Sequence, residues 1–340
     1  MEKLKYKALT FDDVLLLPKY SDFLPSEASI ESKLTKNITL KTPLISAAMD
    51  TVTESKMAIS LAETGGIGII HKNNSIEEQA AQVKAVKKYE SGIVRDPVTI
   101  NSKQSIRELK QLTNELSISG MPVVDDGKLE GIVTSRDFRY AENMDSEVSS
   151  IMTPFEKLIT VEEGFSQEEV MKLMYKNRIE KILVLDTNSN LSGLVTMKDI
   201  EKSAQHPNAT KDSSGRLQVG AALGTSEDTI ERAQALFESG VDVFVVDSAH
   251  GHSKNVIETI KMLKEKFKDV DIIGGNIATA EAATELVRAG ADAVKVGMGP
   301  GSICTTRIIA GIGVPQISAI LEIKKALVGR DINIIADGGI

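Results

Sequence analysis

The sequence predicts an α/β protein, a (β/α)8 barrel of the TIM type into which a pair of repeats is inserted. From residue 217 onward, short buried runs alternate with longer amphipathic stretches, as parallel strands alternate with helices. Each strand-like run ends in small or polar residues, which is typical of the barrel face that carries the chemistry. A block from about 92 to 212 has a different pattern and repeats itself.

Two βα units are expected before this block, and four units followed by a last strand are expected after it. Short apolar runs predict strands at 43–49, 67–71, 217–223, 243–247, 271–276, 293–297 and 332–337. Apolar residues at helical spacing predict helices at 55–63, 76–89, 229–239, 254–266, 280–289 and 318–328. Seven of the eight barrel strands are thereby placed, and the sequence stops directly after the seventh.

Composition limits the function classes. The 340 residues are 41% hydrophobic and carry a net charge of −8, which gives no overall positive field for a nucleic acid or an anionic membrane. The first residues lack the apolar core of a secretion signal, so a cytoplasmic location is expected. One cysteine and four histidines exclude an internal disulfide and disfavour a structural metal site, and the pair His250 and His252 is expected to form hydrogen bonds or face solvent.

The inserted block contains two copies of one module. The run 131–137, GIVTSRD, recurs 62 positions later as GLVTMKD at 193–199. Thr134 and Asp137, like Thr196 and Asp199, have the spacing of a helix capping box, which predicts that they cap helices. The expected domains are 1–91 (first part of the barrel), 92–152 and 153–213 (the two modules), and 214–340 (second part of the barrel).

The stretch after the strand at 293–297 is the strongest candidate for chemistry. Three glycines within five residues, Gly297, Gly299 and Gly301, let the backbone approach a ligand closely. The lone Cys304 follows among small polar residues, whereas a structural cysteine is usually surrounded by apolar ones. We therefore predict that Cys304 is a nucleophile. A dinucleotide fingerprint is excluded, because the third glycine is misplaced and no acidic residue ends a second strand about 20 residues later.

These motifs resemble the inosine-5′-monophosphate (IMP) dehydrogenase family of bacteria. The resemblance covers essentially the whole chain and rests on the motifs FDDVLLLP (11–18), SAAMDTVT (46–53), DSAHGH (247–252), GGN (274–276), the cysteine loop and ADGG (336–339). In that family a tandem CBS module is inserted between the second and third βα units. The resemblance therefore implies that the two repeats are CBS modules, which in some members bind an adenine nucleotide.

The resemblance also implies the reaction and its residues. The Cys304 thiolate would attack C2 of the hypoxanthine ring, hydride would leave to NAD, and water placed near the Thr306 hydroxyl would hydrolyse the thioimidate to xanthosine 5′-monophosphate (XMP). The residues implied to bind substrate are Met49, Ser302, Asp337, Gly338 and Gly339. Those implied to bind NAD are Asp247, Ser248, Asn276, Gly297, Met298 and Gly299. From the residues alone, Asp247 equally fits a helix cap and 337–339 a plain turn.

Further expectations concern assembly and length. The resemblance implies a potassium ion on the carbonyls of Gly299, Gly301 and Cys304, completed by a neighbouring subunit of a homotetramer. Family members continue for more than a hundred residues with a mobile flap and an Arg-Tyr pair that supplies the general base for hydrolysis. The sequence is therefore expected to be a C-terminally truncated fragment with an incomplete barrel that is inactive alone.

Two rival functions stay open. Guanosine monophosphate (GMP) reductase shares the barrel and the cysteine loop but deaminates GMP with NADPH; the inserted repeats and the run 313–316, GVPQ, favour the dehydrogenase. The other rival is a non-catalytic nucleotide sensor, in which the repeats bind ATP or GTP and the barrel is a scaffold.

Overall fold

The computed structural model describes residues 7–89, 94–95, 97–116, 118–141, 143–197, 200 and 205–340. It divides the chain into two compact units, one formed by Met1–Tyr89 with Asn208–Ile340 and the other by Glu90–Pro207. The first is called the barrel unit below, and the second the inserted unit. None of the described helices is both long and apolar enough to cross a membrane.

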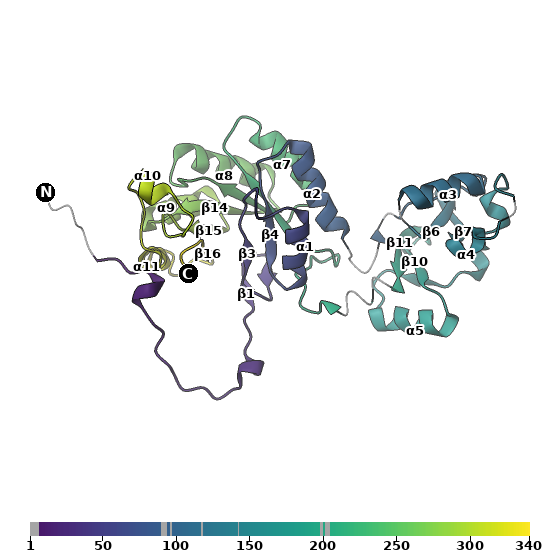
Figure 1. Ribbon diagram of the computed structural model, residues 1–340, viewed down its shortest axis with the longest axis horizontal. Helices are drawn as coiled ribbons and strands as arrows, with labels where there is room; N and C mark the ends of the chain where they lie inside the picture. The colour runs from purple at the N-terminus through teal and green to yellow at the C-terminus, as the bar shows by residue number, and fades with distance from the viewer. Residues whose placement is uncertain are drawn as a thin grey trace. The chain divides into compact units, whose positions relative to one another are not determined.

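A curled sheet of seven parallel strands forms the barrel unit (Figure 1). The strands lie in the order β16-β15-β14-β13-β12-β4-β3. Their bounds are β3 Ile45–Ser46, β4 Ile67–Ile70, β12 Val219–Leu223, β13 Val243–Asp247, β14 Asp271–Ile277, β15 Ala293–Val296 and β16 Asn333–Ala336. The helices between them are α1 Ser55–Glu63, α2 Ile76–Lys88, α7 Thr229–Glu238, α8 Lys254–Lys266, α9 Ala280–Ala289, α10 Thr306–Ile309 and α11 Gln316–Ala326. The predicted barrel class and the seven strands are confirmed.

Three predicted bounds were wrong for local reasons. The strand expected at 43–49 is only β3, because Thr53 Oγ1 donates to the Ala47 carbonyl at 2.6 Å and turns the chain away from the sheet. The strand expected from 217 begins at 219, since Leu217 pairs instead with Lys211. Helix α11 spans 316–326 rather than 318–328, and its first residue, Gln316, is buried and donates to the Val296 carbonyl at 2.8 Å.

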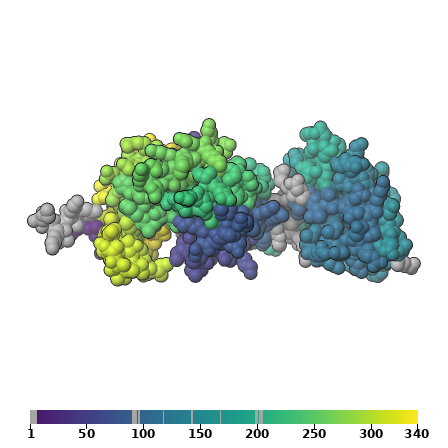
Figure 2. Space-filling view, turned by 90° about the horizontal axis from the view of Figure 1, so that it is seen from above, coloured from purple at the N-terminus to yellow at the C-terminus, as the bar shows by residue number. Residues whose placement is uncertain are grey.

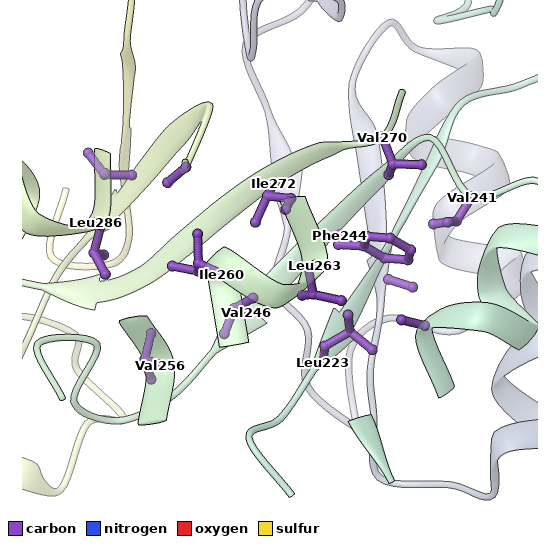
Figure 3. Packing of buried hydrophobic residues seen from close by; sticks show 14 of the residues in the cluster. Leu223, Val241, Phe244, Val246, Val256, Ile260, Leu263, Val270, Ile272 and Leu286 are labelled. Atoms are coloured by element: carbon purple, nitrogen blue, oxygen red, sulfur yellow. The ribbon is translucent and has the colours of Figure 1, made fainter. Parts of the chain in front are cut away.

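Alternation along the strands separates the core into two layers. Phe244 and Val246 of β13 pack outward among the helices, together with Ile260 and Leu263 of α8 and Leu286 of α9. Figure 3 shows this layer, with Phe244 beside Leu263. The neighbouring residues Val243 and Val245 point to the other face of the sheet and join the inner cluster with Ile69 and Ile273. Period-two burial on both faces is expected of a parallel sheet covered by helices.

A buried ion cluster lies in the barrel unit, close to where the chain leaves it for the inserted unit and returns to it. Lys87, at the end of α2, places its Nζ 2.9 Å from Asp212 Oδ2 and 2.9 Å from Asp242 Oδ2, and it also donates to the Leu217 carbonyl at 3.0 Å. The Lys87 side chain is only 4% exposed. Asp242 in turn accepts from the Val219 backbone N–H at the start of β12. The cluster fixes the chain on both sides of the insertion.

The N-terminal segment reaches the last helix of the barrel unit. The Leu9 N–H donates to Ser318 Oγ at 2.8 Å, and the Ser318 N–H donates to the Leu9 carbonyl at 3.3 Å. This segment also contains the short 3₁₀ helices η1 (Phe11–Asp13) and η2 (Pro25–Glu27) and the strand pair β1 (Ser32–Lys33) and β2 (Thr39–Leu40).

Figure 2 shows the residues from β12 to α9 (green) and those after the cysteine loop (yellow) as one continuous surface.

Two similar halves form the inserted unit. The first contains α3 Ile106–Glu115, β6 Gly120–Asp125, β7 Lys128–Thr134, α4 Ser135–Phe138, η3 Val148–Ser150 and β8 Thr153–Pro154. The second contains η4 Phe155–Lys157, β9 Thr160–Glu162, α5 Gln167–Asn177, β10 Lys181–Leu185 and β11 Leu191–Thr196, to which β5 Val94–Arg95 adds a strand. In each half a helix is followed by an antiparallel hairpin, β6–β7 or β10–β11.

The capping prediction holds for the first repeat. Thr134 precedes α4, and the Asp137 carboxylate accepts from the Thr134 backbone N–H at 2.6 Å and from its hydroxyl at 2.8 Å. For the second repeat, Asp199 lies outside the described residues. A cavity of about 260 Å³ lies between the two halves, lined among others by Thr134, Asp137 and Lys181. The domain boundaries at 91, 152 and 213 stay a prediction.

Candidate active site

Three charged side chains meet at the carboxyl ends of the barrel strands. Asp247 ends β13, Lys295 lies in β15, and Asp337 directly follows β16. Lys295 Nζ is 2.7 Å from Asp247 Oδ1 and 3.1 Å from Asp337 Oδ2. The lysine therefore links two carboxylates that the sequence predicted separately, and Asp247 is not a helix cap, since α8 is preceded by Ser253.

Lys295 is a site residue that sequence reasoning missed. Burial works against its charged form, but the nearby Asp247 and Asp337 carboxylates outweigh burial and raise the pKa of Lys295. The ammonium group is therefore charged at neutral pH. A signal was present in the sequence, because Lys295 is a lone cation inside the apolar run AVKV, where strand alternation directs it to the barrel interior.

Asn276 joins the same cluster from β14. The register between β14 and β15 shifts between Gly275 and Ile277, so Asn276 lies in a bulge. Its Nδ2 donates to Asp337 Oδ2 at 2.7 Å and to the Gly297 carbonyl at 2.9 Å. Its Oδ1 is buried and has no hydrogen-bond partner among the described residues. The side chain that was predicted to orient a sugar thus also holds Asp337.

The cysteine loop follows β15 and leads into α10. Its first residue, Gly297, touches the Asp337 backbone so closely that a Cβ would lie 2.1 Å from the Asp337 carbonyl oxygen. This close approach explains the glycine and seats the loop beside the charged cluster. The Cys304 N–H donates to the Gly301 carbonyl at 3.1 Å, and the Cys304 thiol is free and half-buried.

The surroundings of Cys304 favour its thiolate. A hydrogen bond from the Thr306 hydroxyl and one from the Thr306 backbone lower the pKa of the Cys304 thiol, burial opposes them, and the Gly299 backbone and the charge of Arg307 add to the lowering. A lowered thiol pKa raises the thiolate fraction at neutral pH, and the thiolate is the nucleophile. Cys304 and Thr306, predicted together, are brought together by the structure.

A second tight turn closes against the cysteine loop. Gly338 and Gly339 have φ of +75° and +70°, a conformation that glycine adopts without strain. Added Cβ atoms would lie 3.2 Å from the Gly301 Cα and 2.7 Å from the Pro300 Cβ, respectively. Beside these turns lies a cavity of about 660 Å³ lined in part by Ser302, Arg307 and Gly339. The predicted substrate residues 302 and 337–339 therefore share one region.

The structure also places three further residues that the sequence analysis named. The Ser248 N–H donates to the Gly275 carbonyl at 3.0 Å, which places Ser248 beside Asn276. Met49, in the turn after β3, is 38% exposed and has no contact that supports or opposes a substrate role. His252 Nε2 lies 3.0 Å from Glu285 Oε2. Over the part of the chain that the structure describes, no group of three or more His, Cys, Asp or Glu residues could hold a metal ion.

Replacing Thr306 by Val is expected to slow alkylation of Cys304. The variant removes the hydroxyl that stabilises the thiolate, so the thiol pKa rises and the thiolate fraction at pH 7 falls. The rate of reaction with iodoacetamide, measured against pH, should fall a few-fold at pH 7, with its rise displaced to higher pH. Thr305→Ala, at the exposed neighbouring position, is the matched control. An unchanged pH profile in Thr306→Val would show that the hydroxyl does not act on the thiol.

Comparison with known proteins places the chain in a family. A family model described as the IMP dehydrogenase / GMP reductase domain matches residues 8–340. Inosine-5′-monophosphate dehydrogenase of Haemophilus influenzae is 52% identical over 99% of this chain and 70% of that protein. The enzymes of Escherichia coli K12 and Aquifex aeolicus are 51% and 53% identical over the whole chain and again 70% of their own length.

Solved structures of GMP reductase are also similar. The Trypanosoma brucei enzyme in complex with guanosine 5′-triphosphate is 41% identical, with a TM-score of 0.87 over 99% of this chain and 82% of that chain. Because this match includes the inserted unit, a reductase can carry it too, and the inserted repeats do not by themselves exclude a reductase. The family resemblance itself is confirmed: the chain belongs to the IMP dehydrogenase / GMP reductase family of oxidoreductases.

Proposed function

We propose that this protein is an NAD-dependent IMP dehydrogenase, which oxidises IMP to XMP through a covalent adduct on Cys304. One observation carries the proposal: the only cysteine lies beside Thr306 at the mouth of the barrel with a lowered thiol pKa. That geometry occurs in a chain about half identical, over its full length, to curated IMP dehydrogenases.

The reaction divides into two steps at C2 of the hypoxanthine ring. The Cys304 thiolate forms a C–S bond to C2, and the hydrogen on C2 departs with its electron pair. NAD, when bound, accepts this hydride. Water then adds to C2 of the thioimidate, loses a proton and displaces the thiolate, which gives XMP and restores Cys304. Covalent catalysis by cysteine suits this sequence because the thiolate is both a strong nucleophile and a good leaving group.

The substrate half of the site lies on β16 and the cysteine loop. The Asp337 carboxylate, held by Asn276 and Lys295, accepts hydrogen bonds from the hydroxyls of the substrate ribose. Ser302 and Gly339 line one cavity and, with the neighbouring Gly338, hold the phosphate, because backbone N–H groups of a glycine turn form an anion site. Phosphate binding in this part of a (β/α)8 barrel is common.

The cofactor half lies on β13 and β14. Lys295 contacts one oxygen of Asp247, and a carboxylate can accept several more hydrogen bonds, so Asp247 retains capacity for the ribose hydroxyls of NAD. Ser248 and Asn276 lie beside it through the Gly275 backbone, and Gly297 to Gly299 pass the same edge of the sheet. The bare backbone at Gly297 and Gly299 leaves room for a dinucleotide, whereas the Met298 side chain packs against the outer core.

The potassium prediction fits the structure less well. The Gly299 carbonyl accepts from Arg307 Nη1 at 2.6 Å, and the Gly301 carbonyl accepts from the Cys304 N–H at 3.1 Å. A cation at Gly299 would be repelled by the guanidinium group that already contacts this oxygen. With both oxygens engaged in this way, these carbonyls do not fit a potassium ion.

The finer features of the assembly belong to the same proposal. A cytoplasmic homotetramer is expected from the resemblance. In the inserted unit, the cavity between the halves is lined by Thr134, Asp137 and Lys181, whose hydroxyl, carboxylate and ammonium groups suit the ribose and phosphates of a regulatory purine nucleotide. We propose on the same ground that the repeats act as CBS modules, with domain boundaries at 91, 152 and 213.

Substrate choice decides between the dehydrogenase and the reductase. The full-length enzyme is incubated with IMP and NAD or with GMP and NADPH, and the absorbance of the reduced cofactor is followed. A dehydrogenase forms NADH from NAD when IMP is present, and its Cys304 is labelled by 6-chloropurine ribonucleotide. Consumption of NADPH with GMP would instead establish the reductase, and ATP or GTP binding with an inert thiol would establish a sensor.

A further inference from the structure

We propose that Lys295 is a positioning residue that holds the Asp247 and Asp337 carboxylates in place together. The site for the substrate ribose and the site for the NAD ribose are then coupled through a single ammonium group. The inference rests on the proposed function, because it assigns ribose hydroxyls to both carboxylates. No motif of the sequence predicted it. It comes from the place of one lysine between two strand ends.

The geometry makes Lys295 the common partner of both carboxylates. Its Nζ is 2.7 Å from Asp247 Oδ1 and 3.1 Å from Asp337 Oδ2, and its side chain is only 18% exposed. In the sheet, β15 pairs with β14 on one side and β16 on the other, while Asp247 lies at the end of β13, beyond β14. The ammonium group therefore reaches across the barrel mouth in both directions.

Glycines leave the space that this arrangement requires. Gly275 of β14 lies between Asp247 and Lys295 in the ladder, and a Cβ at Gly275 would come within 2.7 Å of the Lys295 Cβ. The backbone of β14 is thus bare where the lysine side chain stands. Asn276 then adds a neutral donor to Asp337 at 2.7 Å, but it carries no charge to offset the two carboxylates. Lys295 is the cation that contacts both.

The charge of Lys295 determines what the carboxylates can do. Without it, two negative groups would share a half-buried region, and each would repel the other. With it, each carboxylate keeps a fixed orientation and spare lone pairs for a pair of ribose hydroxyls, a recognition that aspartate provides in other nucleotide sites. The binding of either nucleotide consequently depends on the same lysine.

The test compares Lys295→Met with Lys295→Arg and a matched control. Lys264→Met serves as the control, because Lys264 Nζ pairs with Asp292 Oδ2 at 2.7 Å before β15, at the opposite end of the strands. Affinities of the full chain for IMP and NAD are measured separately by calorimetry. Lys295→Met should weaken both by about tenfold or more and lose preference for IMP over its 2′-deoxy analogue. Lys295→Arg should largely retain the affinities for IMP and NAD, and Lys264→Met should change neither affinity.

A second measurement separates this inference from the proposed function. Thermal unfolding is compared for Lys295→Met, for Asp247→Asn with Asp337→Asn, and for all three changes together. The triple variant should lose less stability than the losses of Lys295→Met and of the double Asn variant add up to. The reason is that the Asp247 and Asp337 carboxylates, which repel each other in Lys295→Met, are neutral amides in the triple variant. If the wild-type chain binds neither nucleotide, the proposed function fails. Non-additive losses of stability would still show that Lys295 holds Asp247 and Asp337 together. Additive losses, or undiminished nucleotide binding by folded Lys295→Met, would overturn it.

Discussion

Replacing Cys304 by Ala in the full-length enzyme is expected to abolish covalent labelling by 6-chloropurine ribonucleotide and to lower NADH formation from IMP by about 10⁴-fold or more. The reason is chemical: without a sulfur nucleophile, hydride would have to leave C2 directly, with no covalent step to lower the barrier. Mass spectrometry of the labelled chain and the absorbance of NADH measure the two effects.

The control for this variant is nucleotide binding. Cys304 is half-buried and its side chain holds no part of the core, so Cys304→Ala should bind IMP within a few-fold of the wild type. Binding that persists while labelling and turnover disappear assigns the loss to chemistry. Turnover near the wild-type rate in Cys304→Ala would refute the covalent mechanism and with it the central part of the proposed function.

Replacing Lys87 by Met is expected to destabilise the barrel unit by about 3–5 kcal/mol. The substitution leaves Asp212 and Asp242 facing each other in a region where the lysine side chain is only 4% exposed. Asp242 then loses its charge partner, Asp212 keeps only the partly exposed Arg216, whose Nε lies 2.9 Å from Asp212 Oδ2, and the Leu217 carbonyl loses a donor. Urea unfolding gives the free-energy change.

Two further variants make this prediction specific. Lys84→Met, on the exposed face of the same helix, removes a charge without disturbing the cluster and should change stability by less than about 0.5 kcal/mol. Lys87→Met combined with Asp242→Asn should recover part of the loss, since one of the stranded charges is removed. A loss below about 1 kcal/mol for Lys87→Met alone would mean that water replaces the lysine in the cluster.

The sequence predicted the repeating architecture better than its ends. Helices such as 55–63, 254–266 and 280–289 match their predicted bounds, because their amphipathic spacing is clear, and 280–289 is in addition bounded by the Thr279 cap and by Gly290. Strand ends are less certain, since they depend on pairing between distant segments. The Thr53 bond that shortens β3 and the pairing of Leu217 with Lys211 are tertiary effects that leave no local pattern.

The site was predictable where one residue carries the signal. Cys304 is the single thiol in a glycine-rich loop, and Thr306 is two residues away. The charged cluster was not predictable in full, because Asp247, Lys295 and Asp337 lie on three strands and meet only when the sheet curls. The contact of Arg307 with the Gly299 carbonyl was equally invisible, since it depends on how α10 follows the loop.

The parallel pairing of β4 with β12, Gly68 opposite Val219, joins segments that flank the whole inserted unit. For a folding chain this contact closes a very long loop, yet closure entropy grows only logarithmically, by about 0.6 kcal/mol for each doubling of loop length. If the inserted unit forms first around its own core, most of that loop is already compact when β4 and β12 meet. The order of synthesis therefore favours pairing of β4 with β12, because the inserted unit is complete before β12 emerges to continue the barrel.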